Sequence, residues 1–513
     1  MTPLPAPDPV ERVRQVIRDL PPGETWHTPY QEAVRAAHAA SDVATAARLT
    51  AVAAVCHIAA GQYREALAEV DFGLRLAPDI PGVRAELLRA RAGVEIFGAE
   101  PETALRTLDE IALADPAPSD LGRLEQLVHR RVAQCVLLEE QAPGGLAEAL
   151  HAVERAGQST LAATSIPRLI PALVAFGHLD AGRPWVETLA AQAEVLRSRW
   201  HRLEARVLEE ALYAPRGRIH QAIEWPEHPL GFDYFAGWIA AGISSYQAVV
   251  TGGRAPRPLS GLVNRLQSVV PPGFRSGPEG FQAAVAAHLD RRAPVEAEPP
   301  ARVTLFTASS TLAMAEAVAL AGSQRQAVTW ARWFEESWPE AVVTTLSWPA
   351  LVSRVRALLE VRSGDVNAGV RLLRAAVRWA DSHGYPVEAA IARIQLAEML
   401  AHTPMTTARR EWEELRRAGR LGGRAVGIDA SAAAHAVAEA ASLGRFDSVR
   451  PALTPREAEV LHLLAEGRSY RIAAEALGLE WRTVQVHARN IYQKLGVHSK
   501  VEAVLAARDA GLI

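Results

Sequence analysis

A short stretch near the C-terminal end of the chain carries positive charge and no negative charge. Between residues 481 and 501 there is no Asp or Glu, and the basic residues are Arg482, Arg489, Lys494 and Lys500. A one-signed run of this kind on a helix is typical of a surface that contacts nucleic-acid phosphates. The hydroxyl groups of Thr483 and Ser499 could donate further hydrogen bonds to phosphate oxygens.

The same stretch carries side chains that can recognise bases. Gln485 and Arg489 lie four residues apart, so on a helix they share one face. A glutamine amide matches the adenine edge in the major groove, and a guanidinium matches the guanine edge. The candidates for contact with base edges are Arg482, Gln485, Val486 and Arg489, and the candidates for contact with phosphates are Thr483, Lys494, Ser499 and Lys500.

Residues 453–513 contain the helix signals needed to position these side chains. Four short helices are expected, each with a capping residue before it and a glycine after it. The third of them, from Trp481 to Leu495, carries most of the candidates. In chain order the signals are Thr454 with Pro455 and Glu457, Gly467, Ser469, Gly478, Gly496, Ser499 with Glu502, and Gly511.

Helices joined by a short glycine-containing turn predict a helix-turn-helix. Apolar residues at helical spacing then indicate which side of each helix is buried. The expected core of this small domain is Val460, Leu461, Leu464, Ile472, Leu477, Val484, Ile491 and Leu495.

The segment resembles the DNA-binding domain of the LuxR family of bacterial transcription regulators. The resemblance implies four helices, of which the third enters the major groove and the fourth commonly supports a dimer. It also implies base contacts by the residue after Thr-Val and by the residue four positions later, here Gln485 and Arg489. The matching residues are Leu453 to Glu457, Val460, Leu461, Gly467, Ser469, Ala474, Leu477, Gly478, Thr483, Val484, Val486, His487, Ile491, Lys494 to Val497, Ser499, Glu502 and Ala503.

Three positions depart from the family pattern. Glu480 stands where the family usually has a capping Ser, and Gln485 stands where it usually has Lys. A basic and apolar pair in the second helix is shifted, giving Arg471-Ile472-Ala473. These departures leave the preferred bases open.

The long region before this segment is predicted to be helical. The chain of 513 residues has 49% hydrophobic and only 6% aromatic residues, and it lacks alternating strand patterns with hairpin turns. Its length predicts two to four domains. The formal net charge of −3 argues against a chain that is basic throughout, yet leaves room for a small basic domain.

A repeated spacing suggests helix pairs along this region. An Ala is followed twelve residues later by a Pro at Ala66 and Pro78, at Ala104 and Pro116, and at Ala327 and Pro339. A small residue suits a close helix crossing, and Pro ends the second helix of a pair. Gly61 and Gly322, five residues before two of these alanines, are expected to end the first helix in a left-handed turn.

This pattern resembles the tetratricopeptide (TPR) motif, a pair of antiparallel helices of about 34 residues. The match is degenerate, and an irregular helical domain remains the alternative. The fold expected is therefore all-α: a TPR-like helical-repeat solenoid followed by a four-helix LuxR-type helix-turn-helix. Breaks rich in Pro and Gly give these boundaries: a TPR-like array at 10–287, a linker or long loop at 288–303, a second TPR-like array at 304–443, a linker at 444–452, and the helix-turn-helix domain at 453–513.

The motifs of common enzymes are missing. No lysine precedes Lys494, so a phosphate-binding loop that needs Lys cannot occur in the helical region. Cys56 and Cys135 lie far apart and form neither a metal-binding cluster nor a disulfide framework. We expect no catalytic residue, cofactor or metal. With no signal peptide and no apolar run long enough for a membrane span, we expect a cytoplasmic protein with no membrane partner.

We therefore expect a sequence-specific transcription regulator, an activator rather than a repressor, and not an enzyme. Its partners would be double-stranded DNA, on which it would act as a homodimer, RNA polymerase, and a ligand or protein effector sensed by the helical repeats. The alternative is a TPR-like interaction scaffold whose helix-turn-helix does not bind DNA specifically. The tryptophans Trp330, Trp333, Trp338 and Trp348 either pack between helices or line an effector groove.

Overall fold

The computed structural model describes most of the chain. The described residues are 8–18, 26–59, 62–78, 80–98, 100–115, 118–219, 234–252, 277–289, 295–401, 408–430, 453–495, 497 and 499–509. Within these ranges every regular element is a helix and there is no strand, which confirms the predicted all-α class. None of the helices in the described residues is long and apolar enough to cross a membrane.

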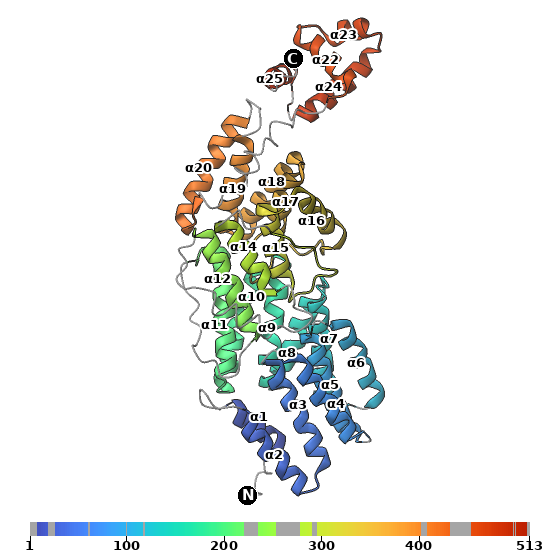
Figure 1. The fold of residues 1–513 in the computed structure, drawn as a ribbon, viewed down its shortest axis with the longest axis vertical. Helices are drawn as coiled ribbons and strands as arrows, with labels where there is room; N and C mark the ends of the chain where they lie inside the picture. Colours follow the sequence, from blue (N-terminus) through green and yellow to red (C-terminus); the bar gives the residue numbers. More distant parts are fainter. Residues whose placement is uncertain are drawn as a thin grey trace. The chain divides into compact units, whose positions relative to one another are not determined.

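The chain divides into two compact units. The first contains Met1–Gly322 and Arg332–Val355, and the second contains Ser323–Ala331 and Arg356–Ile513. Figure 1 shows the helices in chain order.

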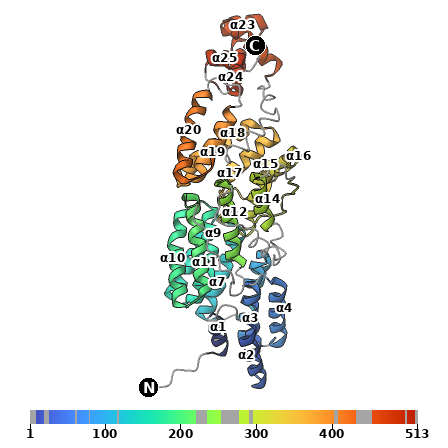
Figure 2. The same cartoon turned by 60° about the vertical axis from the view of Figure 1, so that its left-hand side comes forward.

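Nine helices of the first unit form a regular array. One set comprises α3 (Val43–Ala59), α5 (Pro81–Phe97), α7 (Asp120–Val136), α9 (Ser159–Ala175) and α11 (Arg199–Tyr213). Each helix of this set packs against the next one of the set. The helices between them pack against both neighbours in sequence, as Figure 2 shows for α9, α10 and α11. These are α4 (Tyr63–Leu76), α6 (Pro101–Ala114), α8 (Ala142–Arg155) and α10 (Leu179–Val195).

This pairing is that of a helical-repeat solenoid, in which each helix pair contacts mainly its neighbours. Successive first helices begin at residues 43, 81, 120, 159 and 199, so the repeats are 38, 39, 39 and 40 residues long. The TPR motif is shorter, at about 34 residues. The array is therefore a helical repeat, and its assignment to the TPR family stays a prediction.

The residues that suggested the repeat lie where they were expected. Ala66 in α4, Ala104 in α6 and Ala327 in α16 (Gln324–Ser337) are completely buried. Both α4 and α16 end shortly before Pro78 and Pro339. Pro116 and Gly61 fall outside the described residues.

The expected left-handed turn at Gly322 is wrong. Gly322 follows α15 (Ala308–Ala321), but its φ is −71°, which any residue can adopt. Left-handed glycines do occur between helices of the array, with φ of +67° at Gly157 and +83° at Gly177.

The remaining helices come before and after the array in the sequence. The first two, α1 (Pro9–Arg18) and α2 (His27–Ala39), pack on α3. Beyond α11 and the short 3₁₀ helix at Ala214–Arg216 come α12 (Tyr234–Val250), α14 (Gly277–Leu289) and α15, each packed on the one before it. The second unit also includes parts of α16 and α17 (Val352–Ser363), then α18 (Val366–His383), α19 (Pro386–Ala401) and α20 (Ala408–Val426), with α19 packed on both neighbours.

The segment predicted as a linker, 288–303, lies inside the first unit. Helices α14 and α15 on either side of it pack against each other. Residues after the segment are anchored as well, because the Leu305 amide donates to the Val136 carbonyl at 2.9 Å. The structure therefore places the division between units later in the chain than the sequence did. The other predicted linker, 444–452, and residues 431–443 lie outside the described residues.

A buried ionic cluster holds together the late part of the first unit. Glu316 of α15 is 2% exposed, and its carboxylate lies 2.8 Å from the Arg354 guanidinium. It also accepts a hydrogen bond from the Trp348 indole at 2.9 Å and lies 3.3 Å from the His288 ring. Burial alone would raise the Glu316 pKa, but Arg354 and His288 outweigh burial and lower it.

The tryptophans of the sequence prediction pack in the interior. Trp330 is 1% exposed and Trp348 is fully buried, and Trp333 and Trp338 are also buried. This burial favours the packing interpretation over an open aromatic groove.

Candidate nucleic-acid interface

Four helices form the C-terminal domain, as predicted. They are α22 (Pro455–Ala465), α23 (Tyr470–Leu477), α24 (Trp481–Leu495) and α25 (Lys500–Asp509). Their boundaries follow from the caps. The Thr454 hydroxyl accepts from the Glu457 amide and the Glu457 carboxylate accepts from the Thr454 amide, which completes the predicted capping box.

The turn between α23 and α24 also follows the prediction. The Ser469 hydroxyl accepts from the Ile472 amide and begins α23. Gly478 ends that helix with a φ of +62°, a left-handed conformation that glycine adopts without strain. The turn delivers α24, which packs on α22, α23 and α25 and is thereby held rigidly in the domain.

The core of the domain confirms most of the predicted buried residues. Val460, Leu461, Leu464, Val484, Ile491 and Leu495 are all buried, and Leu477 packs against them while partly exposed. The prediction for Ile472 is wrong, because this side chain is 47% exposed. Helix α23 instead buries the small residues Ala473 and Ala474, which let α23 approach α24 closely.

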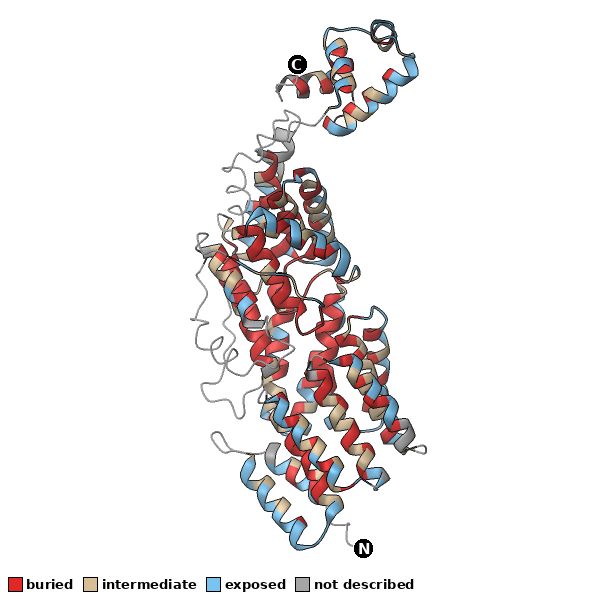
Figure 3. Ribbon diagram, turned by 45° about the vertical axis from the view of Figure 1, so that its right-hand side comes forward, coloured by how far each residue is buried: buried red, intermediate tan, exposed pale blue. Residues whose placement is uncertain are grey.

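Helix α24 has two opposite faces. Val484, Ala488, Ile491 and Leu495, at spacings of four, three and four residues, are buried. A second row has the same spacing, begins two residues earlier and is exposed. It consists of Arg482, Val486, Arg489 and Gln493. A shift of two residues turns a helix by about 200°, so the two rows lie on opposite sides. Figure 3 shows buried and exposed faces on the helices of this domain.

All four predicted base-contact candidates lie on the exposed side. Arg482, Gln485, Val486 and Arg489 are exposed, and Val486 is 57% exposed. Within the described part of the chain, neither Arg482 nor Arg489 forms an ion pair. The exposed face therefore combines unpaired positive charge with an amide and an apolar contact, the chemistry needed to read base edges.

The candidates for phosphate contact differ in their exposure and in the helix that carries them. Thr483 is exposed on α24, whereas Ser499 and Lys500 are partly exposed at the start of α25. The Ser499 hydroxyl accepts from the Glu502 amide and caps that helix. The Lys500 ammonium donates to the Arg468 carbonyl at 2.6 Å. An ammonium has three donors, so Lys500 retains donors for an anion.

Lys494 has a role that the sequence did not reveal. Its ammonium lies 2.6 Å from the Glu457 carboxylate of α22. Burial would raise the Glu457 pKa, but the hydrogen bonds from Lys494 and Thr454 outweigh burial and lower it. The ion pair ties the C-terminal part of α24 to the capping box of α22. Since the two residues are 37 positions apart, no local spacing pointed to the contact.

Two further contacts fix the helices around α24. The hydroxyl groups of Tyr470 and Tyr492 lie 2.6 Å apart and join α23 to α24. The Arg456 guanidinium donates to the Leu477 carbonyl at 2.8 Å and so satisfies a carbonyl at the end of α23. In the residues that the structure describes, no group of three His, Cys, Asp or Glu side chains could hold a metal.

Comparison with known proteins identifies the family of this domain. Residues 451–507 match the family described as "Bacterial regulatory proteins, luxR family". The C-terminal segment is a LuxR-type helix-turn-helix domain. No solved structure matches the chain.

Curated relatives share this LuxR-type domain. The chain is 42% identical over 60 residues to the uncharacterized response regulatory protein YgeK of Escherichia coli. It is 47% identical over 53 residues to the nitrate/nitrite response regulator NarP of the same organism, and 41% identical over 61 residues to the HTH-type transcriptional activator RamA of Corynebacterium glutamicum. These alignments cover 10–12% of this chain and 41%, 25% and 22% of the respective relatives. The likeness thus spans less than half of each relative.

Proposed function

We propose that the protein is a sequence-specific DNA-binding transcription regulator. The observation that supports this most is the exposed face of α24, where Arg482 and Arg489 are unpaired and lie opposite the buried row of the same helix. The helix-turn-helix motif here consists of α23 and α24. In such a motif the second helix lies in the major groove, and its N-terminal residues contact base edges. The relatives that share the domain include one named as a response regulator and one named as a transcriptional activator.

The candidates take two roles in this proposal. Arg482, Gln485, Val486 and Arg489 contact bases, with Val486 suited to a thymine methyl group. Thr483, Lys494, Ser499 and Lys500 contact phosphates and set the register of the domain. Lys494 donates to the Glu457 carboxylate at 2.6 Å. Lys500 donates to the Arg468 carbonyl and retains donors for the backbone of DNA.

The helical array supplies the regulatory part of the proposal. Solenoids present extended surfaces to peptides and partner helices, so the array would bind a protein or small-molecule effector. An effector that binds one conformation better would shift the population that presents two DNA-binding domains, as a homodimer, to two half-sites. We propose that the protein activates transcription in the cytoplasm by contact with RNA polymerase. The relative RamA is named a transcriptional activator, which supports activation.

An in vitro selection tests the proposal. The full-length protein would be mixed with a library of random duplexes, and the bound DNA recovered and sequenced over several rounds. A regulator enriches one sequence pattern and binds it at least roughly a thousandfold more tightly than unrelated duplex at physiological salt. Loss of enrichment, with equal affinity for every duplex, would favour the alternative of an interaction scaffold.

A further inference from the structure

The C-terminal half of α20 has a second basic face. Residues 415–428 contain four arginines and no Asp or Glu. Three of these, Arg417, Arg420 and Arg424, have exposed side chains. Their spacing of three and four residues places them on one side of the helix. We call these three residues the α20 basic face.

The opposite side of α20 explains why the arginines point outward. Gly419 and Gly423 are buried four residues apart. A Cβ atom on Gly419 would lie 2.8 Å from Ile394 Cγ1 of α19, so only glycine permits this close approach. At 100° per residue, the α20 basic face lies about 100–160° around the helix from Gly419. The packing on α19 therefore holds these arginines in solvent.

The α20 basic face has no internal counterion in the described part of the chain. None of Arg417, Arg420 and Arg424 forms an ion pair there, whereas Arg393 on the neighbouring helix is paired with Asp381. Like charges three and four residues apart repel one another. A row of guanidinium groups with no ion-pair partner among the described residues is suited to a polyanion with regularly spaced charges.

We propose that the α20 basic face contacts the phosphates of DNA that flanks the site held by the helix-turn-helix. The inference rests on the proposed function. Only 22 residues, 431–452, separate the last described residue of the α20 segment from the DNA-binding domain. Such a segment spans at most roughly 75–80 Å when fully extended, so a bound duplex stays within reach at high effective concentration. These contacts add affinity that is independent of sequence.

The test compares the salt dependence of binding on long and short duplexes. Full-length protein with Arg417→Gln, Arg420→Gln and Arg424→Gln is titrated with random-sequence duplexes of about 60 and about 20 base pairs at several salt concentrations. On the long duplex, the slope of log affinity against log salt should become shallower by about 2 to 3, roughly one per lost phosphate contact. On the short duplex the slope should stay that of the unchanged protein.

Two matched variants control for charge and folding. Arg64→Gln, Arg75→Gln and Arg106→Gln remove three exposed arginines of the first unit and should leave both slopes unchanged. Lysine at positions 417, 420 and 424 keeps the charge and should restore the slope on the long duplex.

An unchanged slope for the α20 glutamine variant on the long duplex would overturn this inference, and so would an equal loss in the first-unit control. If the unaltered protein selects a DNA sequence but the α20 variant keeps its slope, the proposed function stands and this inference fails. If the unaltered protein binds neither duplex, both fail.

Discussion

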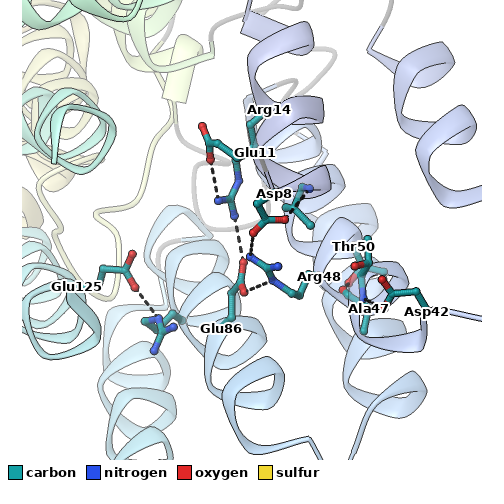
Figure 4. Close-up of polar contacts among 12 residues, drawn as sticks. Asp8, Glu11, Arg14, Asp42, Ala47, Arg48, Thr50, Glu86 and Glu125 are labelled. Atoms are coloured by element: carbon teal, nitrogen blue, oxygen red, sulfur yellow. Dashed lines mark hydrogen bonds and ion pairs between the residues drawn. The ribbon is translucent and has the colours of Figure 1, made fainter. Parts of the chain in front are cut away.

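Arginine has different surroundings in the first helices of the chain and on the exposed face of α24. In the array, Arg48 of α3 lies 2.8 Å from Asp8 and 2.6 Å from Glu86 of α5, and Arg14 of α1 also reaches Glu86 (Figure 4). On α24, Arg482 and Arg489 are exposed and have no ion-pair partner among the described residues. The same residue type thus links helices in one region and remains available to an external anion in the other.

The difference shows why net charge is a poor guide to this molecule. The formal charge of −3 averages many paired charges with short basic rows on α24 and α20, whose arginines have no ion-pair partner in the described part of the chain. Paired charges contribute little to the long-range field, whereas an unpaired row attracts polyanions. Whether each arginine has an ion-pair partner is therefore a better guide to function than the net charge of the chain.

The largest effect is expected where a paired charge is buried in the first unit. Glu316→Gln removes the buried charge that the Arg354 guanidinium contacts, which should cost about 3–5 kcal/mol of unfolding free energy. Denaturant unfolding of the full-length protein, followed by tryptophan fluorescence, would show the unfolding transition at a lower denaturant concentration.

The control for that change is a surface pair. Glu187→Gln breaks the contact between Glu187 and Arg183, whose side chains are 67% and 62% exposed, respectively. The change should lower the free energy of unfolding by no more than about 0.5 kcal/mol. Equal shifts for Glu316→Gln and Glu187→Gln would show that burial of the cluster is not what makes it important.

The next largest effect concerns an unpaired arginine. Arg489→Ala should weaken binding to the selected DNA site by about 1–3 kcal/mol and relax the preference at one base pair. Mobility-shift titrations on the site and on its single-base variants would measure both changes, with Arg183→Ala in the array as the control. A loss of the same size on every sequence would contradict base recognition by Arg489 and indicate a phosphate contact.

A third prediction concerns the pair that positions α24. Glu457→Gln removes the charge that Lys494 contacts and should cost about 1–2 kcal/mol of stability, a modest value because Lys494 is partly exposed. The folded-state pKa of Glu457 lies below its ordinary value of 4.5. The Glu457 charge therefore contributes fully to stability when the pH is above that ordinary pKa. This contribution is lost as the pH falls through the folded-state pKa.

The pH dependence separates the ion pair from simple packing. DNA-domain stability of the unaltered protein should fall as pH drops below about 4.5, and Glu457→Gln should lack part of that fall. Glu459→Gln, which affects an exposed contact with Arg456, serves as the control and should retain the full fall. Identical acid profiles for the unaltered protein and Glu457→Gln would rule out the charge of Glu457 as the cause.

The local parts of the structure could be predicted from the sequence. Thr454, Ser469 and Gly478 define helix ends through contacts within a few residues, and these signals placed the four helices correctly. The alternation of buried and exposed residues also oriented α24. Ile472 was misplaced because a shift of one residue on a short helix moves a side chain by about 100°.

Contacts between distant residues could not be predicted in the same way. The pairs Glu457–Lys494 and Glu316–Arg354 join residues 37 and 38 positions apart, so only the packing of helices brings them together. The repeat of 38–40 residues was indicated in the sequence only by the 38 residues between Ala66 and Ala104, because the motif spacing of twelve residues lies within one helix and its turn.

The salt dependence of DNA binding tests the contrast between paired and unpaired arginines most directly. One double variant carries Arg482→Gln and Arg489→Gln on α24, and a matched one carries Arg130→Gln and Arg183→Gln, whose guanidinium groups are paired in the array. On the selected site, the α24 variant should bind more weakly and with a shallower slope, because two positive charges are removed from the surface that faces DNA. The array variant should match the unaltered protein in affinity and slope. Equal losses in the two variants, or unchanged binding by the α24 variant, would contradict the account.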